Sequence, residues 1–311
     1  MKNIVVIGGG TGLSQLLRGL KWLKEVNLTS IVAVTDEGGS SGIIRNDFEI
    51  PPPGDIRNNI IALAEKESLI TELLGYRFNE GFLKNHNLGN IILLALTRIN
   101  NNNFPLAIKS LSEFLNIKGR VLPSSFELIR IVGEFVDGTV VFGEKNLVSQ
   151  NKKISRVWLD GNSEAYEESI TAIKNSDCII FGPGSLYTSI ITNLLVKGIK
   201  ESIKESKSKL IYISNIMTQP GETNEYNLSD HVEQIEYYLD YEVDYIIANS
   251  GKIPNFILNR YKKRNSSEVK IDMIDDRIIK DDLVYFINEE KTIVRHDSTK
   301  LSKIIKNIIG D

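Results

Sequence analysis

Glycine-rich and hydroxyl-rich loops carry the clearest chemical signal in this chain of 311 residues. They read GGGTG at 8–12, GGSSG at 38–42, GPGSLYTS at 182–189 and QPGET at 219–223. Glycine lets a backbone approach a ligand closely, and free N–H groups at the start of a helix attract phosphate. The first loop precedes the helical pattern LSQLLRGLKWL, so Gly10, Thr11 and Gly12 are predicted to bind an anion. A tight turn between a strand and a helix is the structural alternative.

The first loop matches neither of two common nucleotide motifs. A dinucleotide fingerprint needs a third glycine where this chain has Leu13, and no Gly-Lys-Ser/Thr follows as in a P-loop. Asp36 follows a predicted strand, 24 residues beyond Gly12, where nucleotide-binding folds place a carboxylate on the ribose. Asp36 is therefore a candidate for a ribose hydroxyl or a metal, with turn capping as the alternative. NAD-dependent redox chemistry stays open on this spacing alone.

Two further strings, PPPGDIRN at 51–58 and HNLGN at 86–90, combine rigid and polar residues. Asp55 caps the following helix or serves as an acid, a base or a sugar-hydroxyl acceptor. Arg57 is a candidate phosphate clamp, and either Asn87 or Asn90 is a candidate ligand for a base or sugar. The three histidines are isolated in the sequence, and no metal site is predicted from them.

Apolar runs rich in β-branched residues precede these loops and must position them. The runs lie at 4–7, 31–35, 178–181, 210–214 and 245–248, and helical patterns separate most of them. This alternation predicts a Rossmann-like α/β fold: a mostly parallel sheet with helices on both faces and one ligand site at the carboxyl ends of its strands. We expect a single domain over 1–311, with a helical insertion at about 55–117 and a small antiparallel β insertion at about 120–160, turning at Asp137-Gly138.

The composition of the chain argues against several classes of protein. Lys and Arg number 37 against 40 Asp and Glu, which leaves a net charge of −3 and no basic excess for a nucleic-acid partner. The single cysteine, Cys178, excludes a disulfide within the chain and favours a reducing compartment. No stretch approaches the roughly 18 apolar residues of a membrane span. The expectation is a soluble cytoplasmic protein.

In combination, GGGTG, TDEGGSSG, PPPGDIRN, HNLGN, FGPGSLYTS and NIMTQPGET resemble the bacterial gluconeogenesis factor family, which is related to the 2-phospho-L-lactate transferases. The resemblance extends over nearly the whole chain. It implies a Rossmann-like fold, growth on gluconeogenic carbon sources, and a role in directing sugar precursors to peptidoglycan and cell shape. It also implies UDP-N-acetylglucosamine as the ligand, with no cofactor required.

Carried over residue by residue, the resemblance places the diphosphate near Gly10, Thr11, Gly12, Gly184 and Ser185, with Asp36, Ser40, Asn90 and Asn215 lining the nucleotide sugar. Arg57, Tyr261 and Arg295 complete the twelve candidate ligand residues. Arg295 follows a predicted strand at 292–294 and is expected to reach the diphosphate, with a surface salt bridge as the alternative. Tyr261 is a weaker candidate for stacking on uracil. Phosphate added at Ser298 or Thr299 would introduce negative charge near Arg295.

Two hypotheses follow from different classes of protein. In the first, the chain is a non-catalytic sensor whose bound nucleotide sugar changes a surface recognised by a protein partner, such as a precursor-synthesis enzyme. In the second, it is an Mg²⁺-dependent nucleotidyl or phospho-ligand transferase using Asp36 and Asp55. The transferase relatives carry an acidic Ser-Pro-Asp-x-Asp-Thr stretch where this chain has PPPGDIRN, with Asp55 as its only acid. A symmetric dimer is the default expectation for the assembly.

Overall fold

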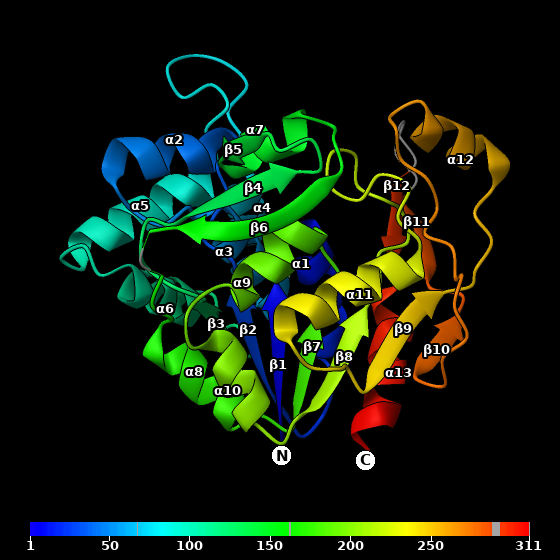
Figure 1. Ribbon diagram of the computed structural model, residues 1–311. Coiled ribbons are helices and arrows are strands. Elements are labelled where there is room, and N and C mark those ends of the chain that lie inside the picture. Colours follow the sequence, from blue (N-terminus) through cyan, green and yellow to red (C-terminus); the bar gives the residue numbers. More distant parts are fainter. Residues whose placement is uncertain (67, 162, 288–292, 311) are drawn as a thin grey trace.

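A seven-stranded parallel sheet forms the centre of the computed structural model, which describes residues 1–66, 68–161, 163–287 and 293–310. The strand order is β10-β9-β8-β7-β1-β2-β3, and all neighbours pair in parallel (Figure 1). The strands are β1 (Lys2–Gly8), β2 (Val26–Val32), β3 (Arg120–Pro123), β7 (Cys178–Phe181), β8 (Lys209–Ile213), β9 (Tyr245–Asn249) and β10 (Ile278–Asp281). The predicted α/β fold is confirmed.

Each face of the sheet packs against its own set of helices. In β1, Val5 and Ile7 point to one core, whereas Ile4 and Val6 point to the other, because successive side chains of a strand alternate. The first core contains α8 (Glu167–Lys174), α9 (Thr192–Leu194), α10 (Ile199–Glu205) and α11 (Leu228–Leu239). The second contains α1 (Gly10–Leu20), α3 (Gly54–Leu63), α4 (Leu69–Gly75), α5 (Leu88–Ile99), α6 (Phe104–Phe114) and α13 (Ser298–Ile309).

Strand β2 begins earlier than its apolar pattern predicts. The prediction was 31–35, whereas β2 pairs with β1 from Val26 to Val32. Its polar residues are tolerated in the interior because they find partners: Ser30 Oγ is fully buried and donates to Asn59 Oδ1 at 3.2 Å. Asp36 consequently lies four residues beyond the end of β2 rather than directly after it.

The segment predicted as antiparallel divides between two sheets. Its first strand, β3, pairs in parallel with β2 at the edge of the main sheet, so this part of the prediction is wrong. The remainder forms an antiparallel sheet of order β5-β4-β6, with strands β4 (Arg130–Phe135), β5 (Val140–Phe142) and β6 (Ile154–Asp160). Gly138 has a φ of +82° in the predicted turn. This sheet, with α2 (Gly39–Phe48) and α7 (Glu144–Ser149), lies beyond the carboxyl ends of the central strands (Figure 1).

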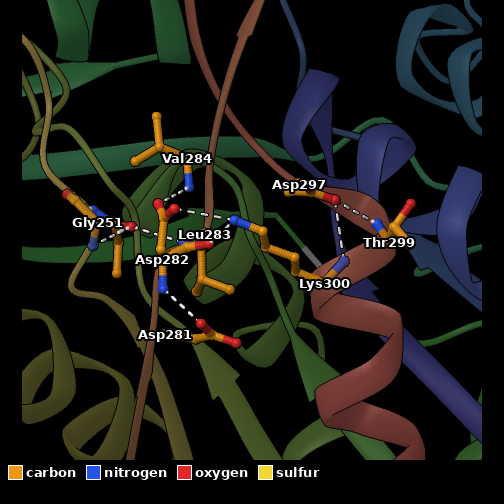
Figure 2. A network of polar contacts seen from close by, with 9 residues as sticks. Gly251, Asp281, Asp282, Leu283, Val284, Asp297, Thr299 and Lys300 are labelled. Atoms are coloured by element: carbon orange, nitrogen blue, oxygen red, sulfur yellow. Dashed lines mark hydrogen bonds and ion pairs between the residues drawn. The ribbon is translucent and has the colours of Figure 1, made fainter.

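The C-terminal segment returns to the same end of the main sheet. It contributes α12 (Asn255–Lys262) and the antiparallel pair β11 (Val284–Ile287) and β12 (Ile293–His296), and then α13, which packs on α1. Figure 2 shows that Asp297 Oδ1 caps α13 by accepting from the N–H groups of Thr299 and Lys300, while Lys300 Nζ reaches Asp282 Oδ2 at 3.1 Å.

Thr292, in the strand predicted at 292–294, lies outside the described residues. None of the described helices is long and apolar enough to cross a bilayer.

Candidate functional site

A cavity of about 440 Å³ lies beyond the carboxyl ends of β1, β7 and β8. Its volume is within the range of small-molecule sites, which is about 300–1,000 Å³. Eight of the predicted ligand residues line it, namely Gly10, Thr11, Gly12, Gly184, Ser185, Asn215, Tyr261 and Arg295. Three larger hollows in the described part of the chain lie away from the glycine-rich loops. They measure about 710 Å³ along β3, about 790 Å³ at the opposite ends of β1 and β2, and about 900 Å³ between α10 and the end of α11.

The first glycine loop forms one wall of the cavity at the start of α1. Gly10 has a φ of +66°, a conformation that favours glycine. A Cβ on Gly12 would lie 2.5 Å from the carbonyl oxygen of Pro183, so the loops after β1 and β7 are in direct contact. The Gly10 N–H donates to Asp55 Oδ2 at 2.7 Å. This contact joins the first loop to the start of α3.

The opposite wall comes from the C-terminal segment. Tyr261 Oη accepts from the Val294 N–H at 3.0 Å, which fixes the ring of Tyr261 beside β12. Arg264 and Arg295 both line the cavity, and neither forms an ion pair with a described carboxylate. Burial lowers the pKa of His296 to about 4, so its imidazole is neutral at pH 7. The positive charge on this wall therefore comes from the two arginines.

The loops after β7 and β8 form the third wall of the cavity, and a chain of hydrogen bonds supports it. Ser185 Oγ donates to Gln219 Oε1 at 2.6 Å, and Gln219 Nε2 donates to Glu222 Oε1 at the same distance. Glu222 also accepts from Thr188 Oγ1 at 3.0 Å and from the Tyr187 N–H at 3.2 Å, in the π-helical turn η1 (Leu186–Ile191). Burial is the main cause that raises the pKa of Glu222, to about 7.

Carboxylates from four separate segments gather next to this cavity, namely Asp36, Asp55, Glu144 and Glu222. Burial raises the pKa of Asp55 to about 6, and the charge of Asp36 adds to the increase. Burial, together with the charges of Asp36, Glu222 and Asp55, raises the pKa of Glu144 well above its ordinary value. Glu144 is the first residue of α7, so the small antiparallel sheet contributes an acid to this region. Clusters of ionisable groups with perturbed pKa values are typical of functional sites.

The remaining predicted residues, Asp36, Ser40, Arg57 and Asn90, do not line the cavity. Ser40 and Asn90 are buried in one network: Asn90 Nδ2 donates to Ser40 Oγ at 3.2 Å, and Asn90 Oδ1 accepts from Arg57 Nη1 at 2.5 Å. Asp36 Oδ1 accepts from the Gly38 N–H at 2.7 Å, directly before α2. These residues surround the start of α2, and Asp55 lies between them and the cavity.

Several residues of this region were not predicted as ligands from the sequence. Arg264 lies three residues after Tyr261 in the basic string NRYKKR, where nothing distinguishes it from its solvated neighbours. Glu222 belongs to the QPGET string, but its burial depends on the packing of η1. Glu144 follows the hairpin of β4 and β5. No local sequence pattern indicates where this hairpin lies relative to the main sheet. Ser298 and Thr299, the proposed modification positions, are the first two residues of α13, and Thr299 is exposed.

The sequence and structure were compared with those of known proteins. A family model described as 2-phospho-L-lactate transferase CofD matches residues 4–290. The chain belongs to the CofD family. Within the family it resembles proteins named as gluconeogenesis factors. A putative gluconeogenesis factor from Thermotoga maritima is 49% identical over 311 residues, covering 98% of this chain and 99% of that protein.

Two further relatives extend the comparison within the CofD family. The gluconeogenesis factor of Bacillus subtilis is 41% identical, covering 99% of this chain and 98% of its own length. A crystal structure of a UPF0052 family protein from Bacillus halodurans superposes with a TM-score of 0.92 at 41% identity, covering 98% of this chain and all of the other. The predicted relationship to both the gluconeogenesis factors and the transferases is therefore confirmed.

Proposed function

We propose that this CofD-family protein is a gluconeogenesis factor that binds UDP-N-acetylglucosamine in the cavity at the ends of β1, β7 and β8. The observation that carries the proposal is the meeting of two glycine loops with Arg264 and Arg295 across one cavity. The start of α1 and the two guanidinium groups match a diphosphate, which carries two negative charges and several acceptor oxygens.

The same cavity offers groups for the rest of a nucleotide sugar. Tyr261 presents an aromatic ring beside Arg264, suited to stacking on a uracil base. Asn215 lines the cavity, and its Oδ1 is buried with no donor among the described groups. An acceptor of this kind gains most from a ligand N–H, because an unpaired buried polar atom is costly. In this role the protein reports precursor supply to a partner enzyme, supports growth on gluconeogenic carbon and directs precursors to peptidoglycan and cell shape.

Calorimetric titration with UDP-N-acetylglucosamine, UDP-glucose, GDP and NAD, each with and without Mg²⁺, tests the proposal. We expect selective binding of the first compound, recovered intact after the titration. Arg264→Ala and Arg295→Ala should each weaken binding by about tenfold or more, since each removes a charge-assisted contact. Lys263→Ala is the matched control, because Lys263 is an exposed neighbour of Arg264 that does not line the cavity. Full-strength binding by both arginine variants would contradict this site.

The second candidate is an Mg²⁺-dependent nucleotidyl or phospho-ligand transferase. It is favoured by the family model and by the neighbouring carboxylates whose charges help to raise the pKa values of Asp55 and Glu144. Asp36 and Asp55 would supply oxygen ligands of the kind that Mg²⁺ prefers, and the ion would polarise a phosphoryl oxygen. Binding of GDP with a strict metal requirement, together with turnover that Asp55→Asn abolishes, would support the transferase over the sensor.

A further inference from the structure

The hollow of about 900 Å³ between α10 and the end of α11 lies on the face of the sheet that carries both helices (Figure 1). Three tyrosines line it, Tyr237, Tyr238 and Tyr241, and we call it the tyrosine groove. Tyr237 is 70% exposed and Tyr241 is 57% exposed. The tyrosine groove is separate from the nucleotide cavity, because the two have no lining residue in common.

Exposed aromatic rings in this groove adjoin buried apolar side chains. Leu194 and Val196, at the end of α9 and just after it, line the groove and are almost completely buried. The rings of Tyr237 and Tyr238 meet edge to face, with their centroids 5.1 Å apart. A small-molecule site encloses most of its ligand, which side chains as exposed as Tyr237 and Tyr241 do not do. Tyrosine next to apolar surface is instead typical of protein interfaces.

The charge of the groove favours a basic partner. Residues 228–244 contain six Asp and Glu and no Lys or Arg. Four carboxylates line the groove, against two cations, Lys197 and Lys200. Glu233, one helical turn before Tyr237, and Glu242 are exposed and form no ion pair with a described residue. Arginine suits this surface best, because its guanidinium stacks on aromatic rings and pairs with carboxylates, while its methylene stem covers apolar side chains.

Tyr238 connects the groove to the interior of the molecule. Its Oη accepts from the Val157 N–H at 2.7 Å, which fixes the ring. The ring meets that of Tyr187 edge to face, with the centroids 6.5 Å apart. Tyr187 is fully buried in η1, and its N–H donates to Glu222. The groove therefore contacts the same helical turn as the acid behind the nucleotide cavity.

Glu222 continues this connection to the cavity itself. It accepts from Gln219 Nε2, and Gln219 Oε1 accepts the single hydroxyl hydrogen of Ser185, which lines the cavity. A ligand phosphate that accepts this hydrogen would leave Gln219 Oε1 without its donor. The side chains of Gln219 and Glu222 would then rearrange, and η1, which Glu222 holds, would move against the ring of Tyr238.

We propose that the tyrosine groove is the docking surface for an arginine-bearing segment of a partner protein, and that nucleotide-sugar binding changes its affinity for that segment through η1. The docking surface stands on the groove alone. The coupling rests on the proposed function, since it requires a nucleotide sugar that contacts Ser185. Two sites coupled in this way influence each other's affinity by the same factor.

Docking is tested by the fluorescence anisotropy of fluorescein-labelled nona-arginine, titrated with the full chain at constant ionic strength. Tyr237→Ala and Tyr241→Ala should each weaken binding by about fivefold, since each removes a stacking ring and leaves the net charge unchanged. Both side chains are exposed, so the variants should fold normally. Tyr76→Ala is the matched control, because Tyr76 is 49% exposed and also meets a second ring, that of Phe78, but follows α4. It should bind as the wild type does.

Two results would overturn the docking surface. One is a wild type that does not bind nona-arginine, or that binds it no more tightly than the two groove variants do. The other is a wild type that sediments as a dimer while Tyr237→Ala sediments as a monomer, because a second copy of the chain would then cover the groove.

The coupling is tested by repeating the titration with saturating UDP-N-acetylglucosamine. We expect the affinity for nona-arginine to change by about fivefold or more. Gln219→Ala should abolish this change and retain the affinity measured without nucleotide, whereas Gln150→Ala, at an exposed glutamine after α7, should behave as the wild type. An unchanged affinity in a protein that binds the nucleotide sugar by calorimetry would overturn the coupling alone. Failure to bind the nucleotide sugar would overturn the proposed function and the coupling with it, while the tyrosine variants would still decide the docking surface.

Discussion

Asp55 and Arg57 lie two residues apart at the start of α3, and burial disfavours the charged form of both side chains. The pKa of Asp55 is raised to about 6, and that of Arg57 is lowered to about 10. A fold selected only for stability would gain by replacing such groups with neutral residues of similar shape. Their presence beside the candidate ligand site is consistent with a functional role that costs stability.

This cost at Asp55 can be measured. Between pH 3.8 and about 6 the folded chain retains a proton that the unfolded chain has released, so the free energy of unfolding decreases as the pH rises through this window. Asparagine cannot ionise and keeps an oxygen that can accept from the Gly10 N–H. We expect Asp55→Asn to be more stable than the wild type at pH 7 by about 1–3 kcal/mol, and the difference to shrink below pH 5.

Urea denaturation at several pH values provides the measurement for Asp55→Asn. Asp160→Asn is a suitable control, because Asp160 is an exposed carboxylate at the end of β6. Its replacement should change stability by less than about 0.5 kcal/mol. An Asp55→Asn protein that is less stable than the wild type at pH 7 would show that the ionised carboxylate gains more from the Gly10 N–H and from Arg57 than the burial of its charge costs.

At the scale of elements, the loops that follow β1 and β7 are in direct contact, and together they form the glycine-rich wall of the cavity. The start of α1 packs so tightly on the loop after β7 that only glycine fits at position 12. The sequence predicted this loop as an anion site from its composition, and it predicted the strands that precede both loops. It did not predict which loops would touch, because that depends on β1 and β7 being neighbours in the sheet while 170 residues apart.

Gly12→Ala tests this contact. Its Cβ would lie 2.5 Å from the Pro183 carbonyl oxygen, so the two loops must separate. We expect the free energy of unfolding to fall by about 1–3 kcal/mol, as for other overpacked positions, and nucleotide affinity to fall by about tenfold or more. Gly75→Ala is the control, since a Cβ on Gly75 meets no atom within 4 Å. Thermal denaturation and calorimetry measure both effects; equal behaviour of the two variants would contradict the contact.

A second contact between elements lies behind the cavity. Gly19 in α1 faces α13, where a Cβ would lie 2.3 Å from the Ser298 carbonyl oxygen. Because α13 directly follows β12, Gly19→Ala should displace the strand that carries Arg295. We expect weaker binding of UDP-N-acetylglucosamine than in Gly75→Ala, although Gly19 does not line the cavity. Unchanged affinity in calorimetric titrations would mean that β12 holds Arg295 in place independently of α13.

At the scale of the whole molecule, the local sequence pattern predicted the class of fold better than it predicted which residues form the cavity. Buried apolar runs revealed the central strands because both faces of a parallel sheet are covered. The edge strands were missed because β10 is a short strand of two isoleucines followed by Lys280 and Asp281, and β3 was interpreted as part of the antiparallel segment. The cavity itself is closed by Tyr261, Arg264 and Arg295, more than 240 residues from the first loop, and no sequence spacing encodes that approach.

The cavity therefore joins the two ends of the chain, and ligand binding should stabilise the molecule as a unit. At a ligand concentration of 100 times Kd, the free energy of unfolding should rise by about 2.7 kcal/mol. We expect UDP-N-acetylglucosamine to raise the Tm of the wild type by several degrees, and Lys263→Ala to respond equally. Arg295→Ala should lose most of this shift at the same concentration. If its shift were retained, the first loop alone would account for binding, and the C-terminal wall would only cover the ligand.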